Sequence, residues 1–180
     1  DTVATLEYSD TKGPHKIIEA DRQTALDKQL GTRASYAPGA ASLQNCSYEG
    51  HLEISREHWR WRGGIQARQV GTGAGFTGAL SPLSHPESLR LLTDLSYQNA
   101  KFADHWEVSA QLSYFELQWK TAGIYILLPP GTLGGAFPEG QLARTFTGER
   151  QTRLNLSAFY TGWTHHTWRV ETGYSNADAS

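Results

Sequence analysis

The stretch that decides the fold is HWEVSAQLSY, at residues 105–114. Apolar or aromatic side chains occupy every second position from Trp106 to Tyr114, and the positions between them are polar. This period of two places successive side chains on opposite faces of a β-strand, whereas an α-helix has a period near 3.6. The stretch, continued to residue 115, therefore predicts a strand with one apolar face and one polar face.

Six further segments alternate in the same way, although the first two do so more weakly. They are residues 2–9, 48–55, 58–70, 89–98, 152–163 and 167–175. The connections between the segments alternate between short and long. Short turns are expected at 56–57, 99–104 and 164–166, and long loops at 10–47, 71–87 and 116–151.

Strands joined in this way are antiparallel neighbours with all short turns at one end. We therefore predict an all-β fold in which residues 1–180 form one domain, an antiparallel up-and-down meander of about seven strands. The first long loop is expected to hold a helix over 22–30, capped by Asp21 and terminated by Gly31. The third is expected to be irregular, because prolines and glycines gather at 127–138; the alternative for its start is an extension of the strand before it.

Composition narrows the class of protein. Sixteen Lys and Arg against 18 Asp and Glu leave a net charge of −2, which argues against a basic nucleic-acid binder. Aromatic residues make up 11% of the chain, too many for a disordered segment. A single cysteine, Cys46, excludes an internal disulfide framework and a cysteine-rich zinc module.

Alternation alone does not tell which face meets water. A soluble calycin-like barrel turns its apolar face inward, whereas a membrane barrel turns it outward against lipid. The aromatic residues favour the membrane barrel, because they gather at strand ends on the apolar face, where Trp and Tyr prefer the level of the lipid headgroups. The expected membrane-interface residues are Trp59, Tyr97, Trp106, Tyr114, Tyr160, Trp168 and Tyr174.

The polar faces and the loops favour the same interpretation. Long charged side chains suit a hydrated lumen in which they pair across strands. The expected lumen-facing residues are Arg60, Arg62, Arg68, Glu107, Arg153, Arg169 and Glu171. Long loops at one end and short turns at the other are typical of outer-membrane barrels. We therefore predict part of a transmembrane β-barrel.

Three stretches carry a family resemblance: HWRWRGG at 58–64, HWEVSAQLSY at 105–114 and RQTRLNLSAFYTGW at 150–163. On these, the chain resembles part of the barrel of a TonB-dependent outer-membrane receptor over most of 44–176. The resemblance implies a 22-stranded barrel, a plug domain inside it, and energy-driven uptake of iron chelates, vitamin B12 or another scarce nutrient. It also implies location in the outer membrane of a Gram-negative bacterium and a partnership with TonB.

The chain departs from that family pattern in two ways. About seven strands do not close an even-numbered bacterial barrel, and we identify no plug-like segment before them. Residues 1–5 (DTVAT) loosely resemble the box that contacts TonB, but they run straight into a strand pattern. We therefore expect a fragment of the barrel domain, whose open edges lipid does not satisfy.

The long loops carry the expected ligand contacts, since loops bind while a scaffold holds them. The candidates for contacting a small-molecule ligand such as an iron chelate are Arg33, Tyr36, Trp119, Tyr125, Phe137 and Arg144. The alternative role of these residues is to pack the loops together.

Two other classes of protein stay open. One is a soluble lipocalin-like or lectin-like binding module with an aromatic interior. The other is a glycan-active hydrolase that uses Glu107 and Glu171, with Asp94 as a further candidate. Polar lumen residues explain all three carboxylates without catalysis, and no catalytic motif occurs. The histidines recur beside the turns, as at His58 and His105, which indicates polar anchors rather than metal ligands. We expect no enzyme activity, metal or cofactor.

Overall fold

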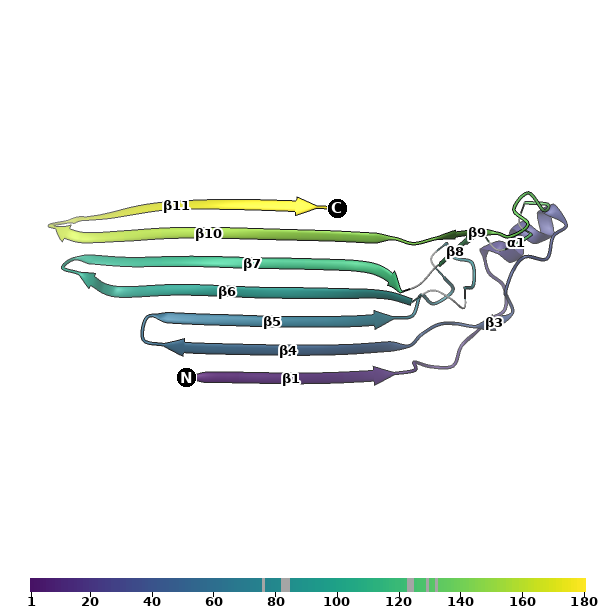
Figure 1. The fold of residues 1–180 in the computed structure, drawn as a ribbon, viewed down its shortest axis with the longest axis horizontal. Helices are drawn as coiled ribbons and strands as arrows, with labels where there is room; N and C mark the ends of the chain where they lie inside the picture. Colours follow the sequence, from purple (N-terminus) through teal and green to yellow (C-terminus); the bar gives the residue numbers. More distant parts are fainter. Residues whose placement is uncertain (76, 82–84, 123–124, 129, 132) are drawn as a thin grey trace.

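The fold is that of a computed structural model, which describes residues 1–75, 77–81, 85–122, 125–128, 130–131 and 133–180. Seven long strands form one sheet (Figure 1). They are β1 (Thr2–Thr11), β4 (Asn45–Arg56), β5 (Trp59–Val70), β6 (His85–Ala103), β7 (Trp106–Ala122), β10 (Phe146–Trp163) and β11 (His166–Ala179). Each predicted strand overlaps one of these seven.

The strands follow one another across the sheet in the order of the chain, and each pair of neighbours is antiparallel. The predicted all-β class and the up-and-down meander are therefore confirmed. The sheet is open: β1 and β11 form its two edges. Both edge strands run toward the end that carries the long loops (Figure 1). Antiparallel closure of this sheet into a barrel therefore requires an odd number of further strands between β11 and β1.

Residues paired across neighbouring strands point to the same side of a sheet. The side that carries Trp61 and Leu95 is called the apolar face, and the side that carries Arg62 and Asp94 is called the polar face. Few side chains are buried on either. The buried apolar residues of the described chain, Ala34, Ala79 and Leu80, all belong to the connections at the loop end. The sheet is thus a single layer without a core of its own.

The turns lie at 57–58, 104–105 and 164–165. The second and third are tighter than predicted, and the first is displaced by one residue from the predicted 56–57. The expected extent of the second turn, 99–104, is wrong because β6 continues to Ala103. A register shift between Asn99 and Ala103 interrupts the alternation there. One residue in each turn, Glu57, His105 or His165, has a φ between 54° and 65°, as tight hairpin turns require.

The loop boundaries differ most at β7, which was expected to end near residue 115 but runs to Ala122. The strand inverts its polarity at Tyr114 and Phe115, two neighbouring aromatic residues. From Phe115 onward the polar face carries Phe115, Leu117 and Trp119, and the apolar face carries Glu116, Gln118 and Lys120. The period of two continues with opposite phase, and this change of phase explains why the expected loop 116–151 begins too early.

The first long connection contains the predicted helix. Helix α1 spans Arg22–Leu30, begins at the N-cap Asp21 and ends at Gly31, which adopts the left-handed conformation. The same connection holds the short strands β2 (Ile17–Ile18) and β3 (Gly39–Ala40), which pair with each other. The third connection is more regular than expected, because β8 (Tyr125–Leu128) pairs with β9 (Gln141–Ala143). The described residues include no helix long and apolar enough to cross a membrane.

Asp21 links two of the long connections. Its carboxylate accepts hydrogen bonds from the amide and hydroxyl of Thr24, both at 2.8 Å, and from the hydroxyl of Ser35 at 2.8 Å. It also accepts from the amide of Leu80 at 2.6 Å, which lies in the connection between β5 and β6. One side chain therefore caps the helix and fixes a second loop to it.

We expect Asp21→Ala to loosen both loops at once. Loss of the cap costs about 1–2 kcal/mol, so amide hydrogen exchange at Thr24 and Leu80 should accelerate roughly tenfold. Lys28→Ala is the control, because Lys28 is an exposed residue of the same helix. Unchanged exchange at Leu80 in Asp21→Ala would show that the link between the loops does not contribute to their stability.

Asp27 predicts a pH dependence for the same region. Burial disfavours its charged form, but hydrogen bonds from Thr32, Gln23 and the amides of Ser35 and Ala34 outweigh this and lower its pKa. A lowered pKa stabilises the fold above the unfolded-state value of about 3.9, and this stability is lost as the pH falls through the folded-state value. The hydrogen-exchange protection factor of Ala34 should stay constant from pH 7 to about 4 and fall only below that. A fall between pH 5 and 6 would contradict this assignment.

Candidate functional site

The polar face gathers the charged residues that the sequence predicts to face a lumen. The register places all of them on one side of the sheet: Arg60, Arg62, Arg68, Glu107, Arg153, Arg169 and Glu171. Several of these side chains form ion pairs, most of them between neighbouring strands. The face is therefore a cross-linked charged surface rather than a set of isolated charges.

Asp94 on β6 is the centre of this surface. It accepts hydrogen bonds from Arg62 on β5 at 2.8 and 3.3 Å, and from Gln111 and Ser113 on β7 at 2.5 and 3.0 Å. Its side chain is 14% exposed, whereas that of Arg62 is 48% exposed. Because both carboxylate oxygens are engaged, Asp94 ties three strands together and has little capacity left for another donor.

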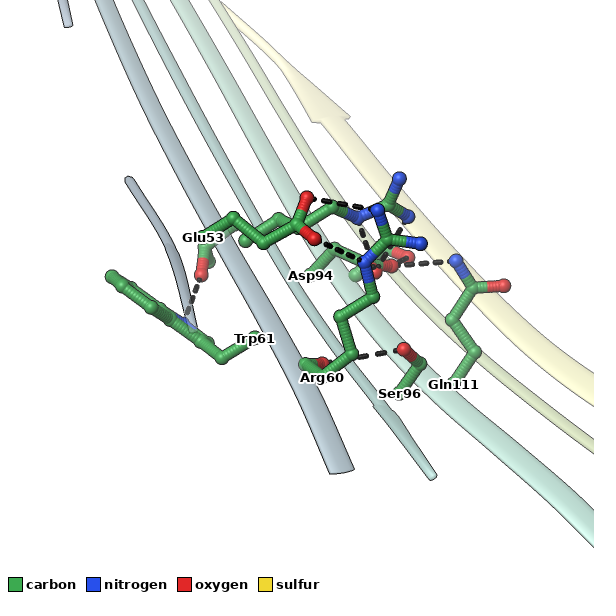
Figure 2. Close-up of polar contacts among 9 residues, drawn as sticks. Glu53, Arg60, Trp61, Asp94, Ser96 and Gln111 are labelled. Carbon is green, nitrogen blue, oxygen red and sulfur yellow. Dashed lines mark hydrogen bonds and ion pairs between the residues drawn. The ribbon is translucent and has the colours of Figure 1, made fainter. Parts of the chain in front are cut away.

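Two further contacts tie β4 to β5. Arg60 donates two parallel hydrogen bonds of 2.8 and 2.9 Å to the carboxylate of Glu53, a bidentate geometry that fixes orientation as well as distance. Glu49 accepts from Arg68 at 2.6 Å. Figure 2 shows Glu53, Arg60 and Asp94 gathered together, while the ring of Trp61 points away from them.

The opposite face carries all seven aromatic residues predicted to lie at a membrane interface. Trp59 pairs directly with Tyr97, and Trp106 pairs with Tyr160, which in turn pairs with Trp168. Tyr114 and Tyr174 lie on the same face nearer the loops. Their role at a membrane interface stays a prediction.

The apolar face is extensively exposed in the described chain. Leu6 is 86% exposed, Val170 64% and Trp59 52%. Such residues occur on every strand of the sheet, so the exposed area is continuous. Soluble monomers rarely expose apolar patches beyond a few hundred Å². This face therefore requires a covering of apolar character.

Aromatic rings form a row along the turn end of the apolar face. The ring centroids of Trp59 and Tyr97 lie 4.8 Å apart, and those of Trp106 and Tyr160 lie 4.9 Å apart. His58 packs edge-on against Tyr97 at 5.9 Å. His105 repeats this contact with Tyr160, so these two turn histidines extend the aromatic row. No group of three or more potential metal ligands occurs among the residues that the structure describes.

The aromatic residues near the loops drift along the strands from one edge of the sheet to the other. The register leads from Tyr48 through β5 and β6 to Gln118, four residues beyond Tyr114 toward the loops. From Tyr114 it leads through β10 to Asn176, two residues beyond Tyr174. At the turn end the register leads from Trp59 to Ala110, again four residues beyond the aromatic residue of β7, Trp106.

This drift measures the tilt of the strands against the apolar band. Tyr8 of β1 pairs directly with Tyr48, so the drift from β1 to β11 is six residues over six strand-to-strand steps. Strands rise about 3.3 Å per residue and lie about 4.8 Å apart, so this drift corresponds to a tilt of about 35°. Strands in closed barrels tilt by roughly 35–45°. A level band of aromatic and apolar side chains on this sheet therefore requires the strand inclination of a barrel.

The predicted ligand residues are scattered over the loop end. Arg33 and Tyr36 follow α1, while Phe137 and Arg144 lie on either side of β9. Among the described residues, no hydrogen bond, ion pair or ring contact joins Arg33, Tyr36 and Phe137 to one another. The structure therefore does not gather them into one site, and their role stays a prediction.

Two of these predicted ligand residues, which were expected in loops, lie in strands instead. Trp119 lies in β7 on the polar face, because the strand continues after its polarity inverts. Tyr125 lies in β8, and its side chain is outside the described part of the structure.

Sequence reasoning missed a hollow of about 420 Å³ on the polar face. Its lining includes the side chains of His51, Arg62, Leu92, Phe115 and Arg153 and the backbone of Gly64. Two apolar doublets, Leu91-Leu92 and Tyr114-Phe115, signal it in the sequence, because each doublet must place one apolar residue on the polar face. Leu92 and Phe115 are direct partners across β6 and β7.

Comparisons of the chain with protein-family models, with curated proteins and with solved structures find no match.

The two kinds of ion pair on the polar face should differ in their contribution to stability. Asp94→Ala removes an acceptor shared by three donors and should lower the free energy of unfolding by about 1.5–3 kcal/mol. Glu171→Gln is the control, because the side chains of Glu171 and its partner Arg169 are both more than half exposed and such pairs contribute about 0–1 kcal/mol. Urea unfolding of the folded protein measures both, and equal effects would contradict the central role of Asp94.

Proposed function

We propose that this chain is part of the transmembrane β-barrel of a TonB-dependent outer-membrane receptor of a Gram-negative bacterium. In this proposal the apolar face contacts lipid and the polar face lines a water-filled lumen. The observation that carries it is the apolar face itself: it is exposed over all seven strands, bounded by aromatic residues at both ends, and level only if the strands tilt as they do in barrels.

The height of the apolar band agrees with a bilayer. From Trp106 to Tyr114 the strand advances eight residues, or about 26 Å at ~3.3 Å per residue. Inclined by about 35°, this corresponds to roughly 20 Å along the membrane normal, close to the ~25 Å band of outer-membrane barrels. The aromatic residues at the two ends then lie at the two headgroup levels.

The inversion of polarity along β7 supports a membrane boundary at Tyr114, on the side of the long loops. Just beyond it on the outward face, Glu116 pairs with Arg150 at 3.2 Å and accepts the Tyr114 hydroxyl at 2.7 Å. Lys120 lies 3.5 Å from Glu87 on the same face. Charged groups on the lipid side of a barrel are costly at the midplane and tolerated at the interface, so this part of the strands belongs in water.

The functional mechanism follows from this placement together with the family resemblance. Loops outside the membrane capture a scarce nutrient such as an iron chelate, and the nutrient passes through the polar lumen with energy supplied through TonB. The helix and the Asp21 link stiffen the first loop against the second, which gives a ligand a preformed surface. A soluble binding module instead requires a second layer over the apolar face, and no described element covers it.

The orientation of the apolar face is tested with single-tryptophan variants. Variants that retain only Trp59, Trp106 or Trp168 should be strongly quenched in bilayers of brominated phosphatidylcholine, most strongly when bromine is attached near the headgroup. A variant that retains only Trp119 is the matched control, since Trp119 lies on the polar face and should escape quenching. A monomer in plain buffer with all four tryptophans unquenched by the bilayers would instead favour the soluble binding module.

Transport is tested in the bacterium that makes the protein. Deletion of its gene should abolish the accumulation of one radiolabelled nutrient among ferric chelates and vitamin B12, and restoration of the gene should recover it. A protonophore should abolish the same uptake in undeleted cells, because the energy comes through TonB. Uptake of every probe at undiminished rates in the deletion strain would contradict the proposed function.

A further inference from the structure

The hollow on the polar face has the size and position of a ligand site. Its volume of about 420 Å³ lies within the range of small-molecule pockets, roughly 300–1,000 Å³. It spans β4 to β10, with its floor on β5, β6 and β7. It lies level with Tyr114, near the loop end of the apolar band, where a molecule admitted by the loops would first meet the sheet.

Its charged residues leave positive charge uncompensated. Asp94 is the one carboxylate in the lining, and it is already engaged by Arg62, Gln111 and Ser113. Arg153 also lines the hollow, is exposed, and has no acceptor among the residues that the structure describes. A guanidinium without an acceptor presents a fork of donors suited to a carboxylate, phosphate or sulfonate.

The apolar part of the hollow is adjacent to this charge. Leu92 and Phe115 are paired neighbours on an otherwise polar surface, and Leu92 is 43% exposed. Gly64 pairs with Leu92 on one side and His51 on the other. A Cβ atom at Gly64 would lie 3.2 Å from the His51 ring, so the glycine keeps the space over the strand open.

We propose that this hollow binds a small molecule that carries an anionic group beside a flat apolar body, such as an aromatic carboxylate. Arg153 holds the anionic group, and Leu92 and Phe115 contact the apolar body. This inference rests on the proposed function only in that a lumen gives such a molecule access to the polar face. It assigns a chemical class to the captured ligand and moves the point of recognition from the loops to the barrel wall.

The test uses 2-naphthoate as the probe, with its affinity measured by calorimetry on the protein reconstituted in lipid nanodiscs. Arg153→Gln should weaken binding at least about tenfold, because a hydrogen bond to a charged group is lost. Arg153→Lys should retain part of the affinity. Arg90→Gln is the matched control: Arg90 is on the same face, likewise has no acceptor among the described residues, and does not line the hollow. It should change affinity less than twofold.

The neutral analogue 2-naphthylmethanol separates the two halves of the proposal. It should bind more weakly than 2-naphthoate and be insensitive to Arg153→Gln. Equal losses in Arg153→Gln and Arg90→Gln would mean that the probe follows the general charge of the face, and absence of binding by the unaltered protein would also overturn the proposal. Bromine quenching of Trp59 in the same nanodiscs reports membrane insertion independently, so failure of the site is distinguished from failure of the proposed function.

Discussion

The whole structure depends on one constraint: a single-layer sheet has two faces, and neither can be buried by the other. The polar face is stable in water, because its charged side chains form cross-strand ion pairs that remain in contact with the solvent. The apolar face has no comparable polar contacts to make with water. Its residues Leu6, Ile65 and Val170 are at least half exposed and lie on strands across the full width of the sheet. Burial of that face must supply most of the stability of the fold, as apolar burial does in proteins generally.

The position where β7 inverts its polarity connects the sheet to the loops. From the turn end up to Tyr114, the apolar residues of the strand lie on the apolar face. From Phe115 toward the loop end, they lie on the polar face. The proposed passage of this strand from lipid into water would explain the change, because the side that faced lipid would then face solvent. The interior side becomes free to carry apolar residues, and these form part of the hollow.

The parts of the structure that depend on local pattern are the ones that the sequence could predict. Alternation identified all seven strands and the faces of the seven predicted lumen-facing and seven predicted interface residues, and Asp21 and Gly31 delimited the helix. Features that depend on register or on distant contacts could not be predicted. The pairing of Leu92 with Phe115 requires the register of β6 and β7, and the hydrogen bond from Leu80 to Asp21 joins residues 59 positions apart.

The edges of the sheet set the conditions under which the hollow works. Because β1 and β11 run in the same direction, closure of this sheet into an antiparallel barrel around the polar face requires an odd number of further strands. Closure would reduce the local dielectric constant around Arg153 and strengthen its attraction for an anion. It would also confine the approach to the hollow to the loop end. In the proposed barrel, the sheet would therefore present the residues that contact the ligand, while closure would supply the access route and most of the electrostatic strength.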